Sequence, residues 1–118
     1  MLKSIIIADS STIGKIGLRA VIDKLDEYYI IDEVESNSEL LESMNSNRPN
    51  LVIIDFFSEG FDIDVIVKIK REHRNSKILA LTTMQSSQTF VHAMRAGVDS
   101  YIKKSCDIQE ITDAIKTT

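Results

Sequence analysis

The sequence predicts an α/β fold in which five parallel strands form one doubly wound sheet with helices on both faces. Short apolar runs alternate five times along the chain with segments of helical periodicity. The connections between them are short, which favours a parallel sheet built with right-handed crossovers. A chain of 118 residues also suits a single compact domain with its own hydrophobic core.

The first two strand–helix units occupy the amino-terminal half of the chain. Residues 3–8 form an isoleucine-rich run typical of a strand buried on both faces, and residues 29–34 form a second, weaker strand. Between them a helix is expected from residue 12 to about residue 26, with Ser10 or Ser11 as its N-cap. A second helix opens at Asn37 or Ser38 and is broken by the proline within residues 48–50. The apolar residues at helical spacing are Ile13, Ile16, Ala20, Val21 and Leu25 in the first helix and Leu40, Leu41 and Met44 in the second.

The remaining three units follow the same pattern. Residues 51–54 are the cleanest buried strand of the chain, and residues 77–81 and 101–102 are the fourth and fifth strands. A third helix capped by Asp62 runs through residue 72, and a fourth covers residues 87–96 and ends at Gly97. Ser105 or Asp107 caps the last helix. The inward residues are Val65, Ile66 and Ile69 in the third helix, and Ile108, Ile111 and Ile115 are the apolar residues of the last.

Polar residues stand at the carboxyl ends of four of these strands. Asp9 and Asp55 end the first and third strands, Thr82 ends the fourth, and Lys103 and Lys104 end the fifth. Ligands of doubly wound sheets bind outside the carboxyl ends of the strands, so these side chains are expected to share one pocket. Two carboxylates, a hydroxyl and an ammonium suit a divalent cation and an aspartyl phosphate.

Four segments carry a resemblance to a known family. The runs IAD at residues 7–9, GLRAVI at 17–22, PNLVIID at 49–55 and AGVDSYIKK at 96–104 together resemble a response-regulator receiver domain of the NarL/LuxR type. The resemblance covers essentially the whole chain. It implies a flavodoxin-like receiver fold with strand order 2-1-3-4-5, a receiver domain over residues 1–118, and a helix-turn-helix output domain that would follow residue 118 in a protein of this type.

The resemblance also implies a role for each residue of the pocket. A carboxylate can attack a phosphohistidine or a small phosphodonor when a metal and a cation neutralise the growing charge on the phosphoryl oxygens. Lys103 is expected to point away from the pocket because side chains alternate along a strand. The implied roles are phosphoacceptor for Asp55, Mg²⁺ ligands for Asp9, Asp55 and the backbone carbonyl of Phe57, phosphate binding for Thr82 and Lys104, and an aromatic switch for Tyr101.

The chain departs from the family pattern at two places. Ser10 stands at the position of a second acidic residue that normally binds the metal directly, and a serine hydroxyl is a poor Mg²⁺ ligand beside a carboxylate. After Asp55, residues 58–59 are Ser-Glu where Met-Pro is expected, and Ile63 replaces a glycine. Weakened Mg²⁺ binding at the atypical Ser10 position is therefore expected.

The predicted function is that of a phosphoacceptor receiver domain in a two-component phosphorelay. A sensor histidine kinase would phosphorylate Asp55, and the change would reach an output, transcription regulation by a DNA-binding domain, through the fourth and fifth helices. Such a domain is not an enzyme beyond catalysing its own phosphorylation and dephosphorylation. The expected partners are the kinase and a second copy of the chain, docked through the fourth and fifth helices or another helical face.

Two alternatives stay open from the residues alone. Ser10 favours a degenerate receiver that works as a phosphorylation-independent interaction module, whereas Asp55 and the two phosphate-binding residues oppose it. The loop at residues 9–15 offers hydroxyls and a glycine at a helix start, where flavodoxin-like proteins cradle a phosphate. That loop is not a P-loop, and the chain has no tryptophan to stack on a flavin.

The composition limits the setting and the partners. The net charge is −4 and the basic cluster at residues 68–74 fits a solvated helix end, so DNA is expected to bind only through an output domain outside this chain. A single cysteine, Cys106, excludes an internal disulfide and favours a reducing compartment. No apolar run approaches the ~20 residues of a membrane span, and no signal-peptide pattern is present. A cytoplasmic domain without membrane contact is expected.

Overall fold

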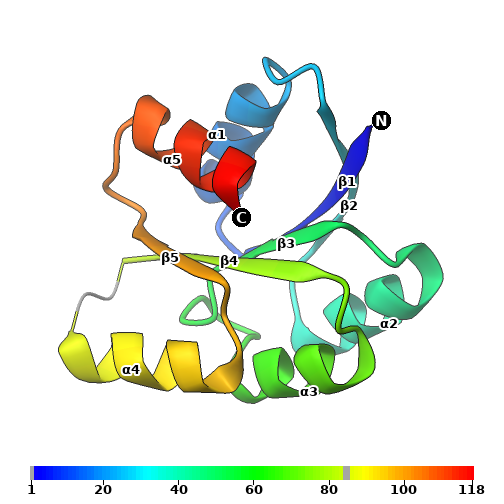
Figure 1. Ribbon diagram of the computed structural model, residues 1–118, viewed down its shortest axis with the longest axis vertical. Coiled ribbons are helices and arrows are strands. Elements are labelled where there is room, and N and C mark those ends of the chain that lie inside the picture. Colours follow the sequence, from blue (N-terminus) through cyan, green and yellow to red (C-terminus); the bar gives the residue numbers. More distant parts are fainter. Residues whose placement is uncertain (1, 84–85) are drawn as a thin grey trace.

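The computed structural model describes residues 2–83 and 86–118 and contains a five-stranded parallel sheet of order β2-β1-β3-β4-β5. Helices α1 and α5 cover one face of this sheet, and α2, α3 and α4 cover the other (Figure 1). The predicted doubly wound fold and its strand order are confirmed. The strands are β1 (Lys3–Ala8), β2 (Tyr28–Val34), β3 (Leu51–Ile54), β4 (Lys77–Thr82) and β5 (Ser100–Lys103). The helices are α1 (Thr12–Ile22), α2 (Asn37–Asn47), α3 (Asp64–Glu72), α4 (Ser87–Ala96) and α5 (Ile108–Thr117).

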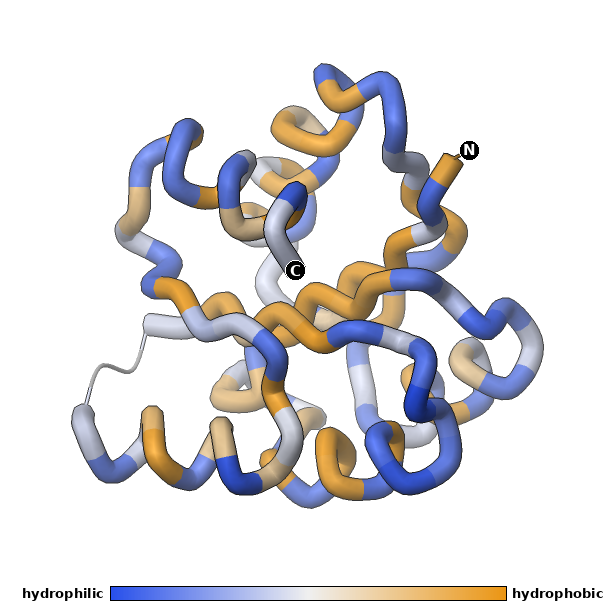
Figure 2. Tube along the Cα trace, in the orientation of Figure 1, coloured by the Kyte–Doolittle hydropathy of each residue, from blue (hydrophilic) through white to orange (hydrophobic). Residues whose placement is uncertain are grey.

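The central strands β1, β3 and β4 are apolar on both faces because both faces are covered by helices. Figure 2 shows this as a band of hydrophobic residues through the middle of the molecule. Alternate side chains enter two separate cores: Ile5 and Ile7 of β1 pack beneath α1 and α5, whereas Ile6 and Ala8 pack against α2, α3 and α4. The sheet therefore separates two hydrophobic cores, and the carboxyl ends of its strands remain available for polar residues.

Short polar side chains set where the helices begin. Ser11 and Asp107, each one of two candidates, cap α1 and α5 by accepting hydrogen bonds from the N–H groups of Gly14 and Glu110. Helix α2 opens at Asn37, as one of the two predicted starts, but its cap is the preceding Ser36. The predicted third cap is shifted, since α3 begins two residues after Asp62, although the Asp62 carboxylate still accepts from the Val65 N–H at 3.3 Å.

Helix α1 buries a different face from the one that its apolar spacing suggests. Ile13 is 83% and Ile16 is 53% exposed, whereas Lys15, Leu18 and Ile22 face the sheet. The first turn lies over the polar carboxyl edge of the sheet. Lys15 is buried there because it forms an ion pair with a residue of the β2–α2 loop, which an isoleucine could not do. The helix also ends at Ile22, four residues before the predicted end, because the chain turns there to enter β2.

Helix α4 matches its predicted bounds and stops at Gly97, whose φ of 116° lies in the left-handed region. None of the helices within residues 2–83 and 86–118 has the length and apolar character needed to cross a membrane.

Candidate functional site

The strand-end residues are held in place by the sheet's own hydrogen bonds, which continue one residue past the strands. The Asp9 N–H donates to the last carbonyl of β2 at 3.2 Å, and the Asp55 N–H to the last carbonyl of β1 at 3.0 Å. The Lys104 N–H likewise donates to the last carbonyl of β4 at 2.8 Å. Each side chain therefore leaves the sheet from a fixed main-chain position at the same edge.

The two carboxylates and the lysine meet in one ion-pair cluster. The Lys104 Nζ lies 2.7 Å from Asp9 Oδ2 and 2.8 Å from Asp55 Oδ2. Asp9 is 1% and Asp55 5% exposed, so the charges face one another with little water between them. The cluster spans the sheet from the central strands β1 and β3 to the edge strand β5.

Each carboxylate uses its second oxygen on the main chain. Asp9 Oδ1 accepts from the Ser11 N–H at 2.8 Å, and Asp55 Oδ1 accepts from the Phe57 N–H at 3.0 Å. These local turns fix the orientation of both carboxylates. Asp9 Oδ2 is buried without a directional hydrogen bond among the described residues, and the nearby Lys104 charge compensates it.

The electrostatics of Lys104 reflect a balance of burial and charge. Partial burial of the ammonium lowers its pKa, but its close contacts with the negatively charged Asp55 and Asp9 outweigh that effect. The net pKa of Lys104 lies above its ordinary value, so the side chain is a permanent cation at neutral pH.

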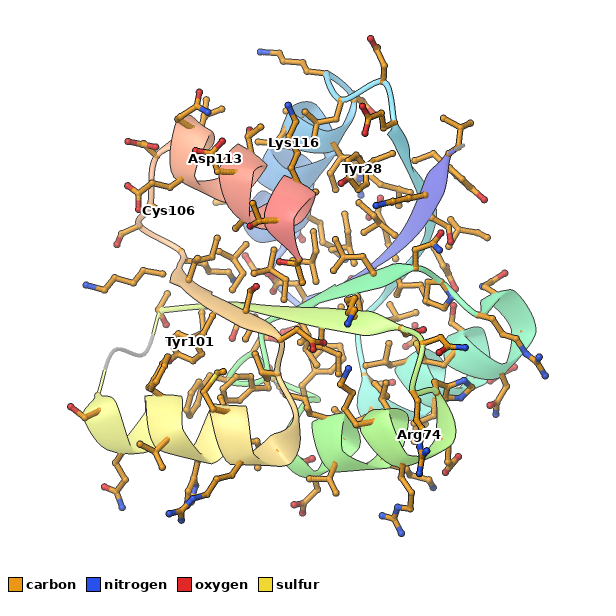
Figure 3. The ribbon with its side chains drawn as sticks, in the orientation of Figure 1. Tyr28, Arg74, Tyr101, Cys106, Asp113 and Lys116 are labelled. Carbon is orange, nitrogen blue, oxygen red and sulfur yellow. The ribbon has the colours of Figure 1, made fainter. Side chains whose placement is uncertain are left out.

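Thr82 and Tyr101 flank the cluster from neighbouring strands. Thr82 is fully buried at the end of β4, in register with Lys103 of β5. The Tyr101 side chain lies between β5 and α4 (Figure 3), with its ring edge-on to Phe90 at 5.5 Å and 6.5 Å from Phe56. Burial, and secondly the charge of Asp55, raise the pKa of the Tyr101 hydroxyl. Tyr101 thus contacts α4, and its hydroxyl lies close enough to Asp55 for the carboxylate charge to raise its pKa.

The loop after β3 contains a contact that sequence reasoning missed. Ser58 Oγ donates to the Asp55 carbonyl at 2.7 Å and accepts from the Ser10 N–H at 3.4 Å. Ser58 thus links the atypical Ser10 position to the backbone of Asp55. Only the bond to the Asp55 carbonyl had a sequence signal, a serine three residues after a strand-end aspartate, which is a spacing typical of a local turn. Glu59 and Lys103 are exposed, and Phe57 is 45% exposed.

Two of the donors that a phosphate cradle at the first turn of α1 would use are already engaged. The Ser11 N–H is bound to the Asp9 carboxylate, and the Gly14 N–H is bound to the Ser11 hydroxyl at 3.1 Å. These donors would have to break existing hydrogen bonds to reach a phosphate, so the flavodoxin-like alternative gains no support from the geometry.

The donor atoms around the cluster suit a hard cation. Within the described residues no group of three or more Asp, Glu, His or Cys side chains is placed to hold a metal. Two carboxylates, one of them with a buried oxygen that lacks a directional hydrogen bond, do stand together. Mg²⁺ commonly binds through one or two carboxylates and keeps several waters, so this donor set fits it without a third acid.

Comparison with known proteins places the chain among signalling domains. Residues 5–116 match the family model described as a response regulator receiver domain. The response regulator protein VraR of Staphylococcus aureus is 26% identical over 115 residues, which cover 97% of this chain and 55% of that protein. The chain therefore spans about half the length of the relatives that it matches.

Solved structures agree in fold over nearly the whole chain. A LuxR-family two-component response regulator from Aurantimonas sp. SI85-9A1 superposes with a TM-score of 0.92 at 25% identity, covering 99% of this chain and 84% of that one. A LuxR-family DNA-binding response regulator from Staphylococcus aureus gives 0.89 at 25% identity, with 98% of both chains covered. The signal receiver domain of the response regulator NarL from Mycobacterium tuberculosis gives 0.91 at 14% identity, over 98% of this chain and 94% of that one, and shows the fold alone.

Proposed function

Because this chain belongs to the family of response regulator receiver domains, we propose that it accepts a phosphoryl group on Asp55 from a sensor histidine kinase. Receiver domains are the phosphoacceptors of two-component systems, and the relatives place this one with the LuxR type. The observation that carries the residue assignment is the cluster in which Lys104 bridges Asp55 and Asp9 at 2.8 and 2.7 Å.

The geometry supports a simple transfer step. An Asp55 carboxylate oxygen forms the new bond to phosphorus while the bond from phosphorus to the donor's imidazole nitrogen breaks, and the imidazole leaves with the electron pair. Asp55 Oδ1 is held by the Phe57 N–H, so the attacking group keeps its orientation throughout. Lys104 then pairs with the phosphoryl oxygens, and the Thr82 hydroxyl binds them from the neighbouring strand end.

Mg²⁺ is the proposed cofactor. Its ligands would be the carboxylates of Asp9 and Asp55 and the backbone carbonyl of Phe57, and water would complete the shell at the Ser10 position. Bound there, the ion would neutralise negative charge on the transferring phosphoryl group. The support for this assignment is the hard-oxygen donor set at the carboxyl edge.

The proposed output runs through Tyr101, whose ring contacts Phe90 of α4. Phosphorylation would change the surface formed by α4 and α5, through which a second copy or an output domain would dock, with another helical face as the alternative for the dimer.

We propose that residues 1–118 are the receiver and that transcription is regulated by a DNA-binding domain of the whole protein in the cytoplasm. A receiver is not an enzyme in the ordinary sense, and its own phosphorylation and dephosphorylation would be the only chemistry that it catalyses.

The test is chemical labelling followed by intact mass spectrometry. Incubation with Mg²⁺ and acetyl phosphate is expected to add one phosphoryl group to the protein and none to Asp55→Asn. Equal labelling of the two proteins would overturn the assignment. The degenerate-receiver alternative is not supported, since the family match spans residues 5–116 and the acceptor aspartate lies in an intact cluster.

A further inference from the structure

Helix α1 contains two glycines three residues apart whose surroundings differ sharply. A Cβ added to Gly14 would lie 2.6 Å from Asp9 Oδ2 and 3.3 Å from Lys104 Nζ. A Cβ added to Gly17 would meet nothing within 4 Å. Glycine is unfavourable in a helix relative to alanine, so alanine should stabilise α1 at position 17, whereas at position 14 its methyl group would meet the Asp9–Lys104 pair.

The Asp9 carboxylate cannot move aside to make room at position 14. Its Oδ1 is held by the Ser11 N–H at 2.8 Å, and its Oδ2 is paired with Lys104 at 2.7 Å. At 1% exposure the side chain has no open solvent to turn into. A rotation that cleared Oδ2 from a new methyl group would carry Oδ1 away from its donor.

Helix α1 cannot recede from the cluster either. Its first turn is tied down by the Ser11 hydroxyl on the Gly14 N–H at 3.1 Å, and by the Lys15 N–H on the Ser11 carbonyl at 3.1 Å. Farther along, Leu18 and Ile22 are buried in the core under the helix. A cavity of about 520 Å³ between α1 and α5 borders Gly14, but it cannot relieve the clash, because the backbone fixes where a Cβ stands.

We propose that Gly14 is a positioning residue of the phosphorylation site. Its missing side chain lets the first turn of α1 lie against the Asp9–Lys104 ion pair, and any side chain at this position drives Asp9 off its place. The inference rests on the proposed function for its consequence, since Asp9 is a proposed Mg²⁺ ligand, but the steric argument stands on the geometry alone. Mg²⁺ demands near-ideal ligand geometry, so a displaced Asp9 weakens metal binding.

The first test compares thermal unfolding of Gly14→Ala and Gly17→Ala, two identical substitutions in the same helix. Gly17→Ala is expected to raise the melting temperature by roughly 3–5 °C, as alanine does at an unhindered helix position. Gly14→Ala is expected to lower it. A melting temperature that rises for both variants would overturn the proposal.

The same substitution made in protein that already carries Asp9→Ala identifies the clashing group. In Asp9→Ala protein the carboxylate is gone, so adding Gly14→Ala is expected to raise the melting temperature as Gly17→Ala does. If Gly14→Ala lowers the melting temperature as much there as in the parent, Asp9 is not the partner and the proposal fails. These comparisons need neither metal nor phosphate, so they decide the steric proposal even if Asp55 proves not to be phosphorylated.

The third measurement separates positioning from mere stability. Calorimetric Mg²⁺ titration at a temperature where all variants are folded is expected to give a dissociation constant about tenfold higher for Gly14→Ala, a difference of ~1.4 kcal/mol. Gly17→Ala is expected to match the parent. Equal affinities of Gly14→Ala and the parent would refute the link to the metal, whereas a parent that binds no Mg²⁺ would refute the proposed cofactor and leave the thermal comparison to decide.

Discussion

Replacing Lys104 with methionine is expected to destabilise the protein by removing the cation that two buried carboxylates share. The two carboxylates and one ammonium carry a formal charge of −1 in the parent, and −2 once the ammonium is lost. Loss of one partner of a buried ion pair typically costs 3–5 kcal/mol. Because the Lys104 side chain keeps 19% of its surface exposed, we expect the low end, about 3 kcal/mol.

The assay is thermal unfolding of Lys104→Met beside Lys103→Met, whose parent residue is the exposed neighbour at the end of β5. For a domain of this size, a loss of about 3 kcal/mol lowers the melting temperature by roughly 12 °C. Methionine keeps most of the length of the lysine stem, so packing changes little. Lys103→Met is expected to unfold close to the parent.

Mg²⁺ gives the same prediction a second readout with the opposite sign. Without the competing ammonium the carboxylates attract the metal more strongly, so Lys104→Met is expected to bind Mg²⁺ about tenfold more tightly, or ~1.4 kcal/mol. Saturating Mg²⁺ should then recover much of the lost melting temperature. If Lys104→Met melts like Lys103→Met in chelator, the ion pairs do not stabilise the fold and the reasoning is refuted.

Three further outcomes follow from the geometry. Ser10→Asp is expected to tighten Mg²⁺ binding tenfold or more, ~1.4 kcal/mol, in a titration against the parent, and to lower the melting temperature measured with a metal chelator present. Unchanged affinity would mean that the side chain at position 10 does not reach the metal. Leu18→Ala is expected to cost about 2–5 kcal/mol in urea unfolding, whereas Ile13→Ala costs under about 0.5 kcal/mol, and similar losses would contradict the observed face of α1. Stability is expected to fall as pH rises above about 10, because folding raises the pKa values of both Lys104 and Tyr101. The stability that Lys104 contributes is complete below its ordinary pKa of 10.5 and is lost as the pH rises through its higher folded-state pKa. A fall in the urea midpoint between pH 8 and 11.5 that is as large for Lys104→Met as for the parent would contradict the lysine part of this prediction.

The sheet and its carboxyl edge were predictable because parallel strands leave strong signals. Buried strands read as unbroken apolar runs, and four of the five predicted strands end at a polar residue that the shared edge must bring together. The gathering of Asp9, Asp55 and Lys104 follows from that topology. Their roles in phosphoryl transfer stay predictions until they are measured.

What escaped the sequence depends on contacts between distant segments. The apolar spacing of α1 gave no warning that its first turn lies over a polar edge, which leaves Ile13 exposed and buries Lys15. The bridge from Ser58 to Ser10 joins two loops that are 48 residues apart, and no local pattern encodes that pairing. The clash hidden behind Gly14 likewise exists only once β1, α1 and the loop after β5 are assembled.

The three charged residues of the ion-pair cluster are not attached to the sheet in the same way. Each carboxylate is clamped by a main-chain N–H at the end of a central strand that has a hydrogen-bonded neighbour on both sides. Lys104 instead sits on a flexible stem just past β5, which pairs with β4 alone at the margin of the sheet. The lysine thus lies directly after one of the two edge strands, the strand that also bears Tyr101. If a phosphoryl group on Asp55 draws Lys104 toward it, as proposed, the displacement is therefore expected at the edge of the sheet, and the central strands need not deform.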